Sequence, residues 1–394
     1  MFSLIGRSLV FVFFTTFFFA CQSDATGEEQ SKNQVVEQYA DFVLASYQQA
    51  KADAEALRTA IGNFTTNPTA ELFEEAKTAW LAARESFGPT EAFRFYDGPI
   101  DMIDGIEGPE ALINSWPMDE WYIDYIQEEA DGEIRFSGII NDPESYPTID
   151  RNLLVELNMA TGDKSVCTGY HAIEFLLWGQ DLTAPELKLA GQRSYTDYVD
   201  GGAIPHADRR RNYLNVCTDL LIDNLDELIG QWQADGDYRT QFLAKDSKVA
   251  LSRIMTGITT LANNELAIER TLVPFESGNQ EDEHSCFSDN THRDLRLNFK
   301  GIQQVYFGKP SEGGNPSLHS LIESKNKELA EQIAEKFVET EQAVDNTTIP
   351  FDYGIIDEGG RAKMELAIDD LQDLSELILA GGATIDLSVN AAMK

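Results

Sequence analysis

A histidine and a glutamate three residues apart, His171 and Glu174, form the pair with the clearest chemical potential in this sequence. If the segment around them is an α-helix, the two side chains lie on the same face, one turn apart. An imidazole nitrogen and a carboxylate oxygen could then bind one cation, and these donors suit iron, zinc or copper better than calcium or magnesium. The alternative is structural: a histidine that is hydrogen-bonded to a glutamate one turn away.

The spacing of apolar residues predicts that helices position this pair. Apolar residues recur every three or four positions over most of the chain, as in the series Phe73, Ala76, Trp80, Ala83 and Phe87. This is the pattern of an amphipathic helix, and no segment alternates with the period of two that a half-buried strand would show. We therefore expect an all-α protein. For the helix of this series, Asn67 is the expected N-cap and Pro68 the first helical residue.

Bundles of four or more long helices are the natural way to bury such faces. The polar, glycine-containing stretch from Ser194 to Ala207 is the best candidate for a boundary between two of them. We predict an N-terminal bundle over residues 33–200, which carries His171 and Glu174, and a C-terminal bundle over residues 201–394.

The charge of the chain restricts its partners. The 394 residues include 30 Lys and Arg against 67 Asp and Glu, which gives a formal net charge of -37. A nucleic-acid-binding protein needs clustered basic residues to displace the counterions of phosphates, so we expect no nucleic-acid partner. A surface of this kind attracts cations, although selection for solubility alone would also explain the bulk charge.

The beginning of the chain has the pattern of an export signal. Arg7 precedes an apolar run from Leu9 to Ala20, which is too short to span a bilayer comfortably, and Cys21 follows directly. A small residue before a cysteine resembles a bacterial lipoprotein signal, in which the cysteine becomes lipidated. We predict a signal peptide over residues 1–20, a lipid anchor on Cys21 that attaches the protein to a membrane, and a flexible tether over residues 21–32. The alternative is an ordinary cleaved leader with an incidental cysteine.

Three further cysteines, Cys167, Cys217 and Cys286, allow one disulfide and one free thiol. Cys167 and Cys217 both lie in helical patterns, and packed helices can bring such positions within bridging distance. We predict a disulfide between these two; the alternative is three buried free thiols. No two cysteines have the short spacing of a structural zinc motif.

The segment from Gly169 to Asp181, which reads Gly-Tyr-His-Ala-Ile-Glu-Phe-Leu-Leu-Trp-Gly-Gln-Asp, resembles the signature of the imelysin family of exported bacterial proteins. Two other regions carry the same resemblance, from Ala79 to Asp101 and from Glu283 to His292. Together the three regions span most of residues 35–380 in the expected order. The family includes a membrane peptidase and iron-regulated lipoproteins.

The resemblance implies a pair of four-helix bundles, with the motif of His171 and Glu174 facing a cleft between them. It also implies that Glu91 and Asp101 help to hold the cation. Two histidines from the other half of the chain could close the site across the cleft; these are His284 and His292.

The flanking motifs also contain residues with structural interpretations. Arg84 and Arg94 could orient the carboxylates of the site or form ordinary ion pairs. Thr291 and Asp294 have the spacing of a helix capping box.

The sequence leaves three classes of function open. In the first, the protein is an exported lipoprotein of the outer membrane, on its periplasmic face or at the cell surface. It would bind a transition-metal ion, iron before zinc or copper, alone or as a chelate, and would pass it to an iron transporter.

The second class is a metallopeptidase, which needs about three protein ligands, an open position for water and a general base. Neither H-E-x-x-H nor H-x-x-E-H occurs, because Phe175 follows Glu174. The third class is a non-catalytic lipoprotein that binds carbohydrate or a partner protein.

Overall fold

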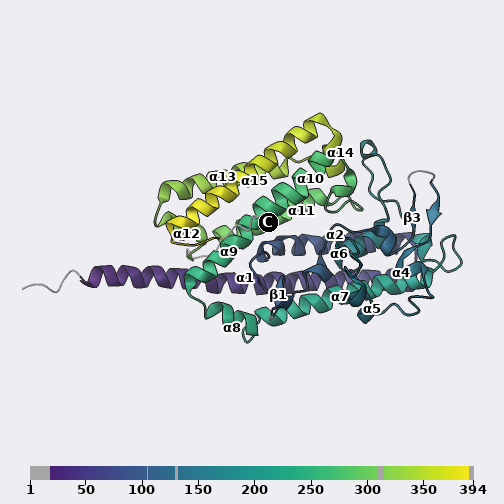
Figure 1. The fold of residues 1–394 in the computed structure, drawn as a ribbon, viewed down its shortest axis with the longest axis horizontal. Helices are drawn as coiled ribbons and strands as arrows, with labels where there is room; N and C mark the ends of the chain where they lie inside the picture. Colours follow the sequence, from purple (N-terminus) through teal and green to yellow (C-terminus); the bar gives the residue numbers. More distant parts are fainter. Residues whose placement is uncertain (1–17, 104, 129–131, 309–314, 390–394) are drawn as a thin grey trace, which may run out of the picture.

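The computed structural model describes residues 18–103, 105–128, 132–308 and 315–389 (Figure 1). The described chain is all-α, which confirms the expected fold class. Its strands form only two short antiparallel ribbons, β1 (Met102–Ile103) with β2 (Ile106–Glu107) and β3 (Ile126–Gln127) with β4 (Ile134–Arg135). Met102 pairs with Glu107 in the first ribbon, and Ile126 pairs with Arg135 in the second.

Long helices build two bundles, and shorter ones connect them. The longer helices are α1 (Phe18–Thr66), α2 (Ala70–Phe87), α6 (Gly169–Trp178), α7 (Ala207–Trp232), α9 (Ser247–Thr260), α11 (Thr291–Phe307), α13 (Lys327–Asp345) and α15 (Glu358–Thr384). The short α-helices are α3 (Glu110–Ile113), α4 (Gly138–Asn141), α5 (Arg151–Leu157), α8 (Asp237–Leu243), α10 (Val273–Ser277), α12 (Leu318–Glu323) and α14 (Phe351–Ile356). Short 3₁₀ helices are η1 (Gly88–Phe93), η2 (Glu120–Tyr122), η3 (Pro185–Leu187), η4 (Tyr195–Tyr198) and η6 (Gln280–Asp282), and η5 (Leu261–Leu272) is a π-helix.

The first bundle consists of α1, α2, α6 and α7, in which α1 packs along α2 and α7 (Figure 1). Helix α1 can do this because its buried residues recur every three or four positions: Val36, Ala40, Val43, Tyr47, Ala50, Ala54, Leu57, Ile61 and Phe64. The expected N-cap of α2 is wrong. Thr69 caps this helix by accepting a hydrogen bond from the N–H of Leu72, so the helix begins two residues after Pro68.

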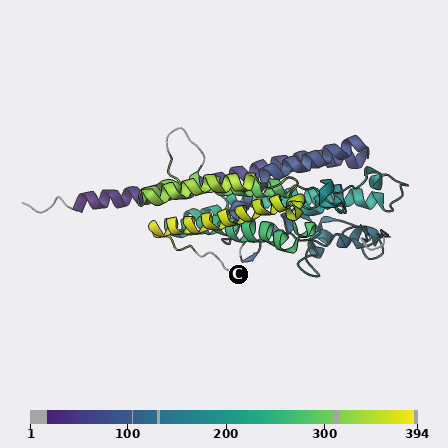
Figure 2. The same ribbon diagram turned by 90° about the horizontal axis from the view of Figure 1, so that it is seen from above.

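The second bundle consists of α11, α13, α15 and the continuous helical segment α9–η5–α10. Helix α15 packs against α13, α9 and η5, and Figure 2 shows α13 and α15 side by side. The middle of the continuous segment, η5, is π-helical over 12 residues. Such helices are rare and often occur at functional sites.

The two bundles meet along a seam of glycines. A Cβ atom on Gly301 of α11 would lie 2.3 Å from the carbonyl oxygen of Pro89 in η1, and one on Gly88 would lie 2.6 Å from the Cβ of Leu297. On the neighbouring helix α9, a Cβ on Gly257 would lie 2.9 Å from the carbonyl oxygen of Arg94. The missing side chains therefore allow backbone to approach backbone directly.

The packing shows how the chain is divided between the bundles. Helix α7, which lies after the expected boundary at residue 200, packs on α1 and α6 of the first bundle. The division into folding units at that residue stays a prediction, but the change of packing partners falls after α8, where α9 joins the second bundle.

The N-terminal predictions fall partly outside the described residues. Most of the expected signal peptide, residues 1–17, lies outside them, and so does the side chain of Cys21. The stretch expected to be a flexible tether is instead the first part of α1, where Glu28 pairs with Lys32 and with Lys325 of the second bundle. Among the helices of the described chain, none is long and apolar enough to span a membrane.

Cys167, Cys217 and Cys286 are buried free thiols, so the structure does not contain the predicted disulfide. Each of the two expected partners points at a carbonyl oxygen instead. The sulfur of Cys217 lies 3.5 Å from the oxygen of Cys167, and the sulfur of Cys167 lies 3.4 Å from the oxygen of Leu154.

Candidate metal centre

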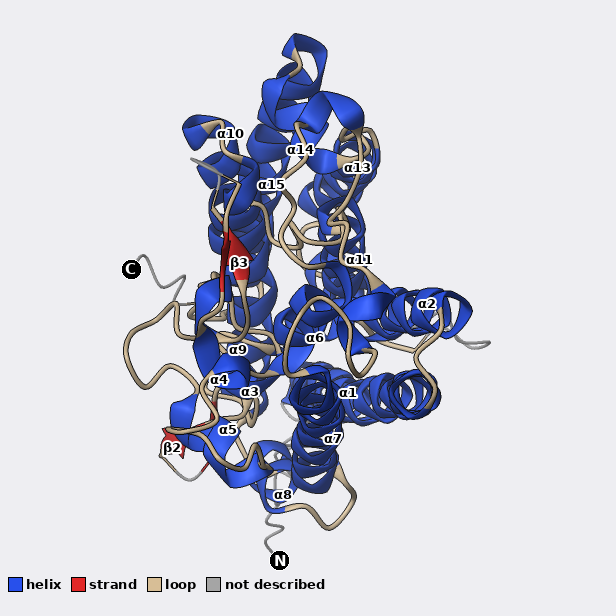
Figure 3. Cartoon of the chain, turned by 90° about the vertical axis from the view of Figure 1, so that its right-hand side faces the viewer, coloured by secondary structure: helices blue, strands red, loops and turns tan. Residues whose placement is uncertain are grey.

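Helix α6 holds His171 and Glu174 in the interior, and all ten of its residues are buried. Figure 3 shows α6 near α1, α2 and α7, below the second bundle. The helix starts abruptly at Gly169, whose φ is 82°. A Cβ there would lie 2.4 Å from the carbonyl oxygen of Ile113. Glycine is therefore required two residues before His171.

His171 and Glu174 are hydrogen-bonded to each other, with 2.9 Å between Nδ1 and Oε2, and both side chains are fully buried. The other oxygen of Glu174 accepts hydrogen bonds from the backbone N–H of Ser288 at 3.0 Å and from its hydroxyl at 2.6 Å. Burial raises the pKa of Glu174 to about 8 and, together with the charge of Arg84, lowers the pKa of His171 to about 3. Between about pH 3 and pH 8 the pair is therefore neutral, with one proton on the carboxyl of Glu174 and one on the imidazole of His171.

His284 forms a second histidine–carboxylate pair, with 2.9 Å between its Nδ1 and Oδ2 of Asp294. The carboxylate of Asp294 also accepts from the hydroxyl of Ser285 at 2.5 Å and from the guanidinium of Arg84 at 2.9 Å. Burial lowers the pKa of His284 to about 3, so its imidazole is neutral. Burial alone would raise the pKa of Asp294, but Arg84 holds it well below the usual value.

The two imidazoles are neighbours. Their ring centroids lie 4.7 Å apart and their planes meet at 84°, while the indole of Trp116 lies 5.0 Å from the His171 ring. The Nε2 atom of His171 is buried and has no hydrogen-bond partner among the described residues. In both pairs a carboxylate binds Nδ1, which leaves Nε2 as the atom available to a ligand. Metal-binding histidines typically have this arrangement, in which the carboxylate orients the ring.

A cavity of about 360 Å³ lies beside His284 and is lined by residues of both halves of the chain. Trp116 and Asn114 come from the first half, and His284 comes from the second. The charged residues of its wall are Arg94, Glu110, Glu265, Glu269, Arg270 and Asp282. Three of them, Glu265, Glu269 and Arg270, lie on the π-helix η5. The cavity gives a polar approach to His284.

Glu91 and Asp101 belong to neither of the two histidine–carboxylate pairs. Glu91 is buried and accepts hydrogen bonds from Arg94 at 3.0 Å and Arg270 at 2.8 Å. Although burial acts in the opposite direction, these guanidinium groups lower its pKa to about 2. Asp101 accepts a hydrogen bond from the N–H of Tyr96, and burial raises its pKa to about 6. In this structure Glu91 is part of an ion-pair network that links the two halves.

The remaining residues of the flanking motifs have structural contacts. Arg84 binds Asp294 and the amide oxygen of Asn114. His292 does not join the histidine pairs, since its Nδ1 lies 3.0 Å from the carbonyl oxygen of Asp289. The capping-box interpretation of Thr291 and Asp294 is wrong, because the Asp294 carboxylate binds His284 instead.

The predicted ligands are therefore brought together only in part. His171, Glu174 and His284 are neighbours, whereas Glu91 lies with two arginines and Asp101 lies by Tyr96. No three ligand atoms of the five predicted residues gather as closely as one metal ion requires in the described chain. Sequence reasoning missed Ser288 and the contact of Asp294 with His284, which depend on how the loop before α11 folds onto α6.

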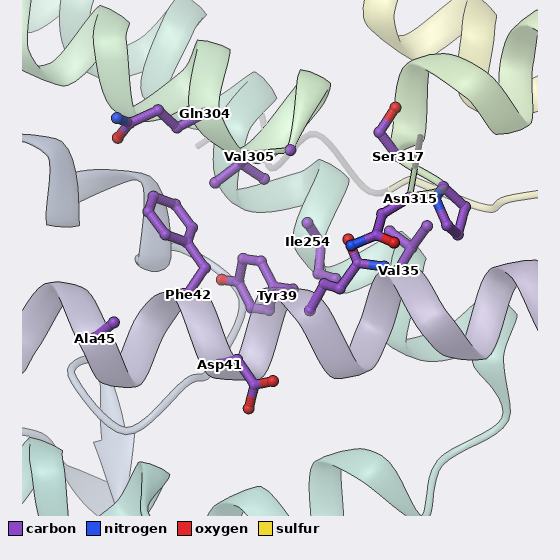
Figure 4. Close-up of a pocket in the computed structure, with 13 residues that line it drawn as sticks. Val35, Tyr39, Asp41, Phe42, Ala45, Ile254, Gln304, Val305, Asn315 and Ser317 are labelled. Atoms are coloured by element: carbon purple, nitrogen blue, oxygen red, sulfur yellow. The ribbon is translucent and has the colours of Figure 1, made fainter. Parts of the chain in front are cut away.

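A second pocket, of about 340 Å³, lies against α1 and contains none of these residues (Figure 4). Its wall includes Val35, Tyr39, Phe42, Ile254 and Val305, and the carboxylate of Asp41 points away from it. It lacks histidine, so it is not a candidate for a transition metal.

The buried histidine motif and the all-α architecture agree with the comparison to known families. The chain matches the model of the imelysin family, also described as peptidase family M75, over residues 43–378, and it belongs to this family.

Two individual proteins are similar over nearly the whole chain. Iron-regulated protein A of Synechococcus elongatus is 25% identical over 378 residues, which are 92% of this chain and 88% of the relative. The crystal structure of a provisionally named iron-regulated protein A precursor from Parabacteroides distasonis superposes with a TM-score of 0.70 at 17% identity. The superposition covers 91% of this chain and 95% of the Parabacteroides protein. At this identity the similarity supports the fold alone.

Proposed function

We propose that this protein binds a transition-metal ion, iron before zinc or copper, through the Nε2 atoms of His171 and His284. The observation that carries the proposal is the unpartnered Nε2 of His171, which is buried beside the ring of His284. A buried polar atom without a partner costs free energy, and a bound ion would remove that cost. Glu174 and Asp294 act as positioning residues because each binds the Nδ1 of its histidine.

The acidic cavity next to His284 supports the same proposal. Glu110, Glu265 and Glu269 would attract a cation, and Arg94 and Arg270 would allow an anionic chelate to approach with it. Iron is preferred to zinc and copper because the similar protein of Synechococcus elongatus bears a name that refers to iron regulation. In this proposal the protein captures iron outside the cytoplasm, as an outer-membrane lipoprotein, and delivers it to an iron transporter.

The direct test is metal analysis of the protein purified without added chelator, followed by calorimetric titration with Fe²⁺ under anaerobic conditions and with Zn²⁺ and Cu²⁺. We expect one equivalent of bound metal. If the native protein contains no metal and none of the three ions binds at micromolar concentration, the proposal is wrong.

The affinity for metal is expected to fall as the pH falls below about 8. Below that pH, Glu174 is protonated and donates to Nδ1 of His171, so Nε2 of the neutral ring carries the other proton. A metal ion must displace one proton, and the affinity should decrease about tenfold per pH unit well below pH 8, or about 50-fold from pH 8 to pH 6.

This dependence can be measured by calorimetry with Co²⁺ at pH 6, 7 and 8, in two buffers with different ionisation enthalpies. One proton should be released per ion at pH 6 and 7. An affinity that stays constant down to pH 6.5 and falls only below it would indicate an ordinary exposed histidine, whose pKa is about 6.5.

The proposed anchor makes a separate prediction. If Cys21 carries lipid, the mature protein should fractionate with membranes, and Cys21→Ala should release it or block its processing. Cell fractionation and mass spectrometry of the mature amino terminus test this. An unmodified amino terminus in the soluble fraction would contradict the anchor and would leave the metal site unaffected.

The geometry supports a metallopeptidase less well. A peptidase of this kind needs a free general base near the metal-bound water, whereas both oxygens of Glu174 are already engaged, one in the hydrogen bond with His171 and the other as acceptor from Ser288. Binding of carbohydrate or of a partner protein has no comparable observation in its favour.

A further inference from the structure

A second group of ligand atoms lies beyond the histidine pairs. Asp181 follows α6, Asp289 lies in the loop before α11, and Asp352 is in the first turn of α14. One carboxylate oxygen from each of them lies within 4.8 Å of the other two, and all three residues are buried. Three segments that are far apart in the sequence therefore direct carboxylates at one point.

These carboxylates have little compensation from the protein. Asp352 is only 1% exposed, and neither of its oxygens has a side-chain hydrogen-bond partner in the described chain. One oxygen of Asp181 and one of Asp289 are also buried without a partner. No ion pair joins any of the three to a basic side chain among the described residues. The charge of Lys188 acts on Asp352, but its ammonium group lies over the ring of Tyr353.

The arrangement is costly without a cation. Burial and the mutual repulsion of the carboxylates raise the pKa of Asp289 to about 8 and that of Asp352 to about 6. A protein gains nothing in stability from such a cluster when it is empty, whereas a divalent cation would offset both the repulsion and the lost hydration.

We propose that Asp181, Asp289 and Asp352 form a binding site for Ca²⁺. The donors are all hard carboxylate oxygens, which calcium prefers and which are poorly suited to the softer metals that histidine binds. Oxygens bound to one Ca²⁺ at 2.3–2.6 Å are separated by up to about 5 Å, whereas around Mg²⁺ the limit is about 4.2 Å. Separations of up to 4.8 Å lie in this range for Ca²⁺, and side-chain shifts of a few tenths of an ångström would bring all three oxygens within bonding distance of one ion.

The bound Ca²⁺ would link the two bundles close to the histidine pairs. Asp181 lies three residues after the end of α6, and Asp352 belongs to the short helix that packs on α15 of the second bundle. Asp289 directly follows Ser288, whose N–H and hydroxyl bind Glu174. Calcium would thus fix the loop that holds the His171–Glu174 pair, without contact with either histidine.

The test is thermal unfolding and calorimetric titration of the full-length protein with CaCl₂ after treatment with a chelator. We expect one Ca²⁺ per chain and a rise in Tm of roughly 3 °C at a hundredfold excess over the Kd. Asp289→Asn and Asp352→Asn should lower the affinity at least ~100-fold and abolish the rise in Tm. Asp289 has a φ of 56°, a conformation that asparagine also adopts, so the first variant should fold normally.

Asp357→Asn is the matched control, because Asp357 lies five residues after Asp352 but already caps α15 through the N–H of Gly360. It should bind Ca²⁺ like the wild type, and so should His171→Asn, since the proposed iron site is separate. The inference is wrong if millimolar Ca²⁺ neither binds nor raises Tm, if Mg²⁺ alone does so, or if Asp289→Asn and Asp352→Asn retain the response.

Discussion

Replacing His171 by asparagine is expected to reduce the affinity for transition metals at least ~100-fold, with a loss of stability of only about 1 kcal/mol. The side-chain amide of asparagine takes the place of Nδ1 and can keep the hydrogen bond with Glu174, whereas the atom equivalent to Nε2 is missing. The variant therefore separates the proposed ligand atom from the hydrogen bond that stabilises the helix. Isothermal calorimetry and circular dichroism melts measure the two effects.

Glu174→Gln tests the positioning carboxylate in the same assay. Its amide group cannot lose a proton, so it would donate to Nδ1 and keep the proton on Nε2 at every pH; metal affinity should therefore fall about 10–100-fold although no ligand atom is removed. His206→Asn is the control: His206 begins α7 with a φ of 62°, which asparagine tolerates, and it does not line the cavity. If His171→Asn binds metal like the wild type, His171 is a structural residue.

The second large effect is expected for Asp294→Ala, which should destabilise the protein by about 3–5 kcal/mol. Asp294 is fully buried and neutralises Arg84, and it also binds His284 and Ser285. Removing it leaves a buried guanidinium without its counter-charge. In a chain of this length the loss corresponds to a drop in Tm of roughly 4–6 °C.

Asp345→Ala provides the comparison, because Asp345 pairs with Arg296 at the surface, where it is 60% exposed. That substitution should cost less than about 1 kcal/mol. The pKa of Asp294 is lowered in the folded protein, so its contribution is present above pH 4 and is lost only in strong acid. Equal melting temperatures for the two variants would contradict the importance of the Arg84–Asp294 pair.

The sequence predicts the fold well where the apolar pattern is continuous. The stripes over α2, α7, α11 and α13 each correspond to a helix, because one face of each is buried. The tether is less well predicted, since a polar, charged stretch has no apolar periodicity even when ion pairs such as Glu28–Lys325 hold its helix. The packing of α7 on the first bundle is a tertiary property that the loop before it does not reveal.

The sequence predicts only part of the candidate site. The spacing of His171 and Glu174 places both on one helix face, and the structure places them within hydrogen-bond distance. Spacing does not say whether the glutamate faces a metal or the histidine ring, and here it binds the ring. His171 and His284 are more than one hundred residues apart in the sequence, so their proximity depends on the contact between the bundles. The aspartate cluster likewise draws on three segments that no local motif connects.

The glycine seam between η1, α9 and α11 bears on how the protein would discriminate between ions. With backbone against backbone at Gly301 and Gly257, the two bundles have little room to slide or rotate past each other. Ligands contributed by both halves are then held at fixed separations and cannot adjust to each ion that enters. Selectivity among iron, zinc and copper would follow from preferred bond lengths and coordination geometry, with an ion of the wrong size left under-coordinated.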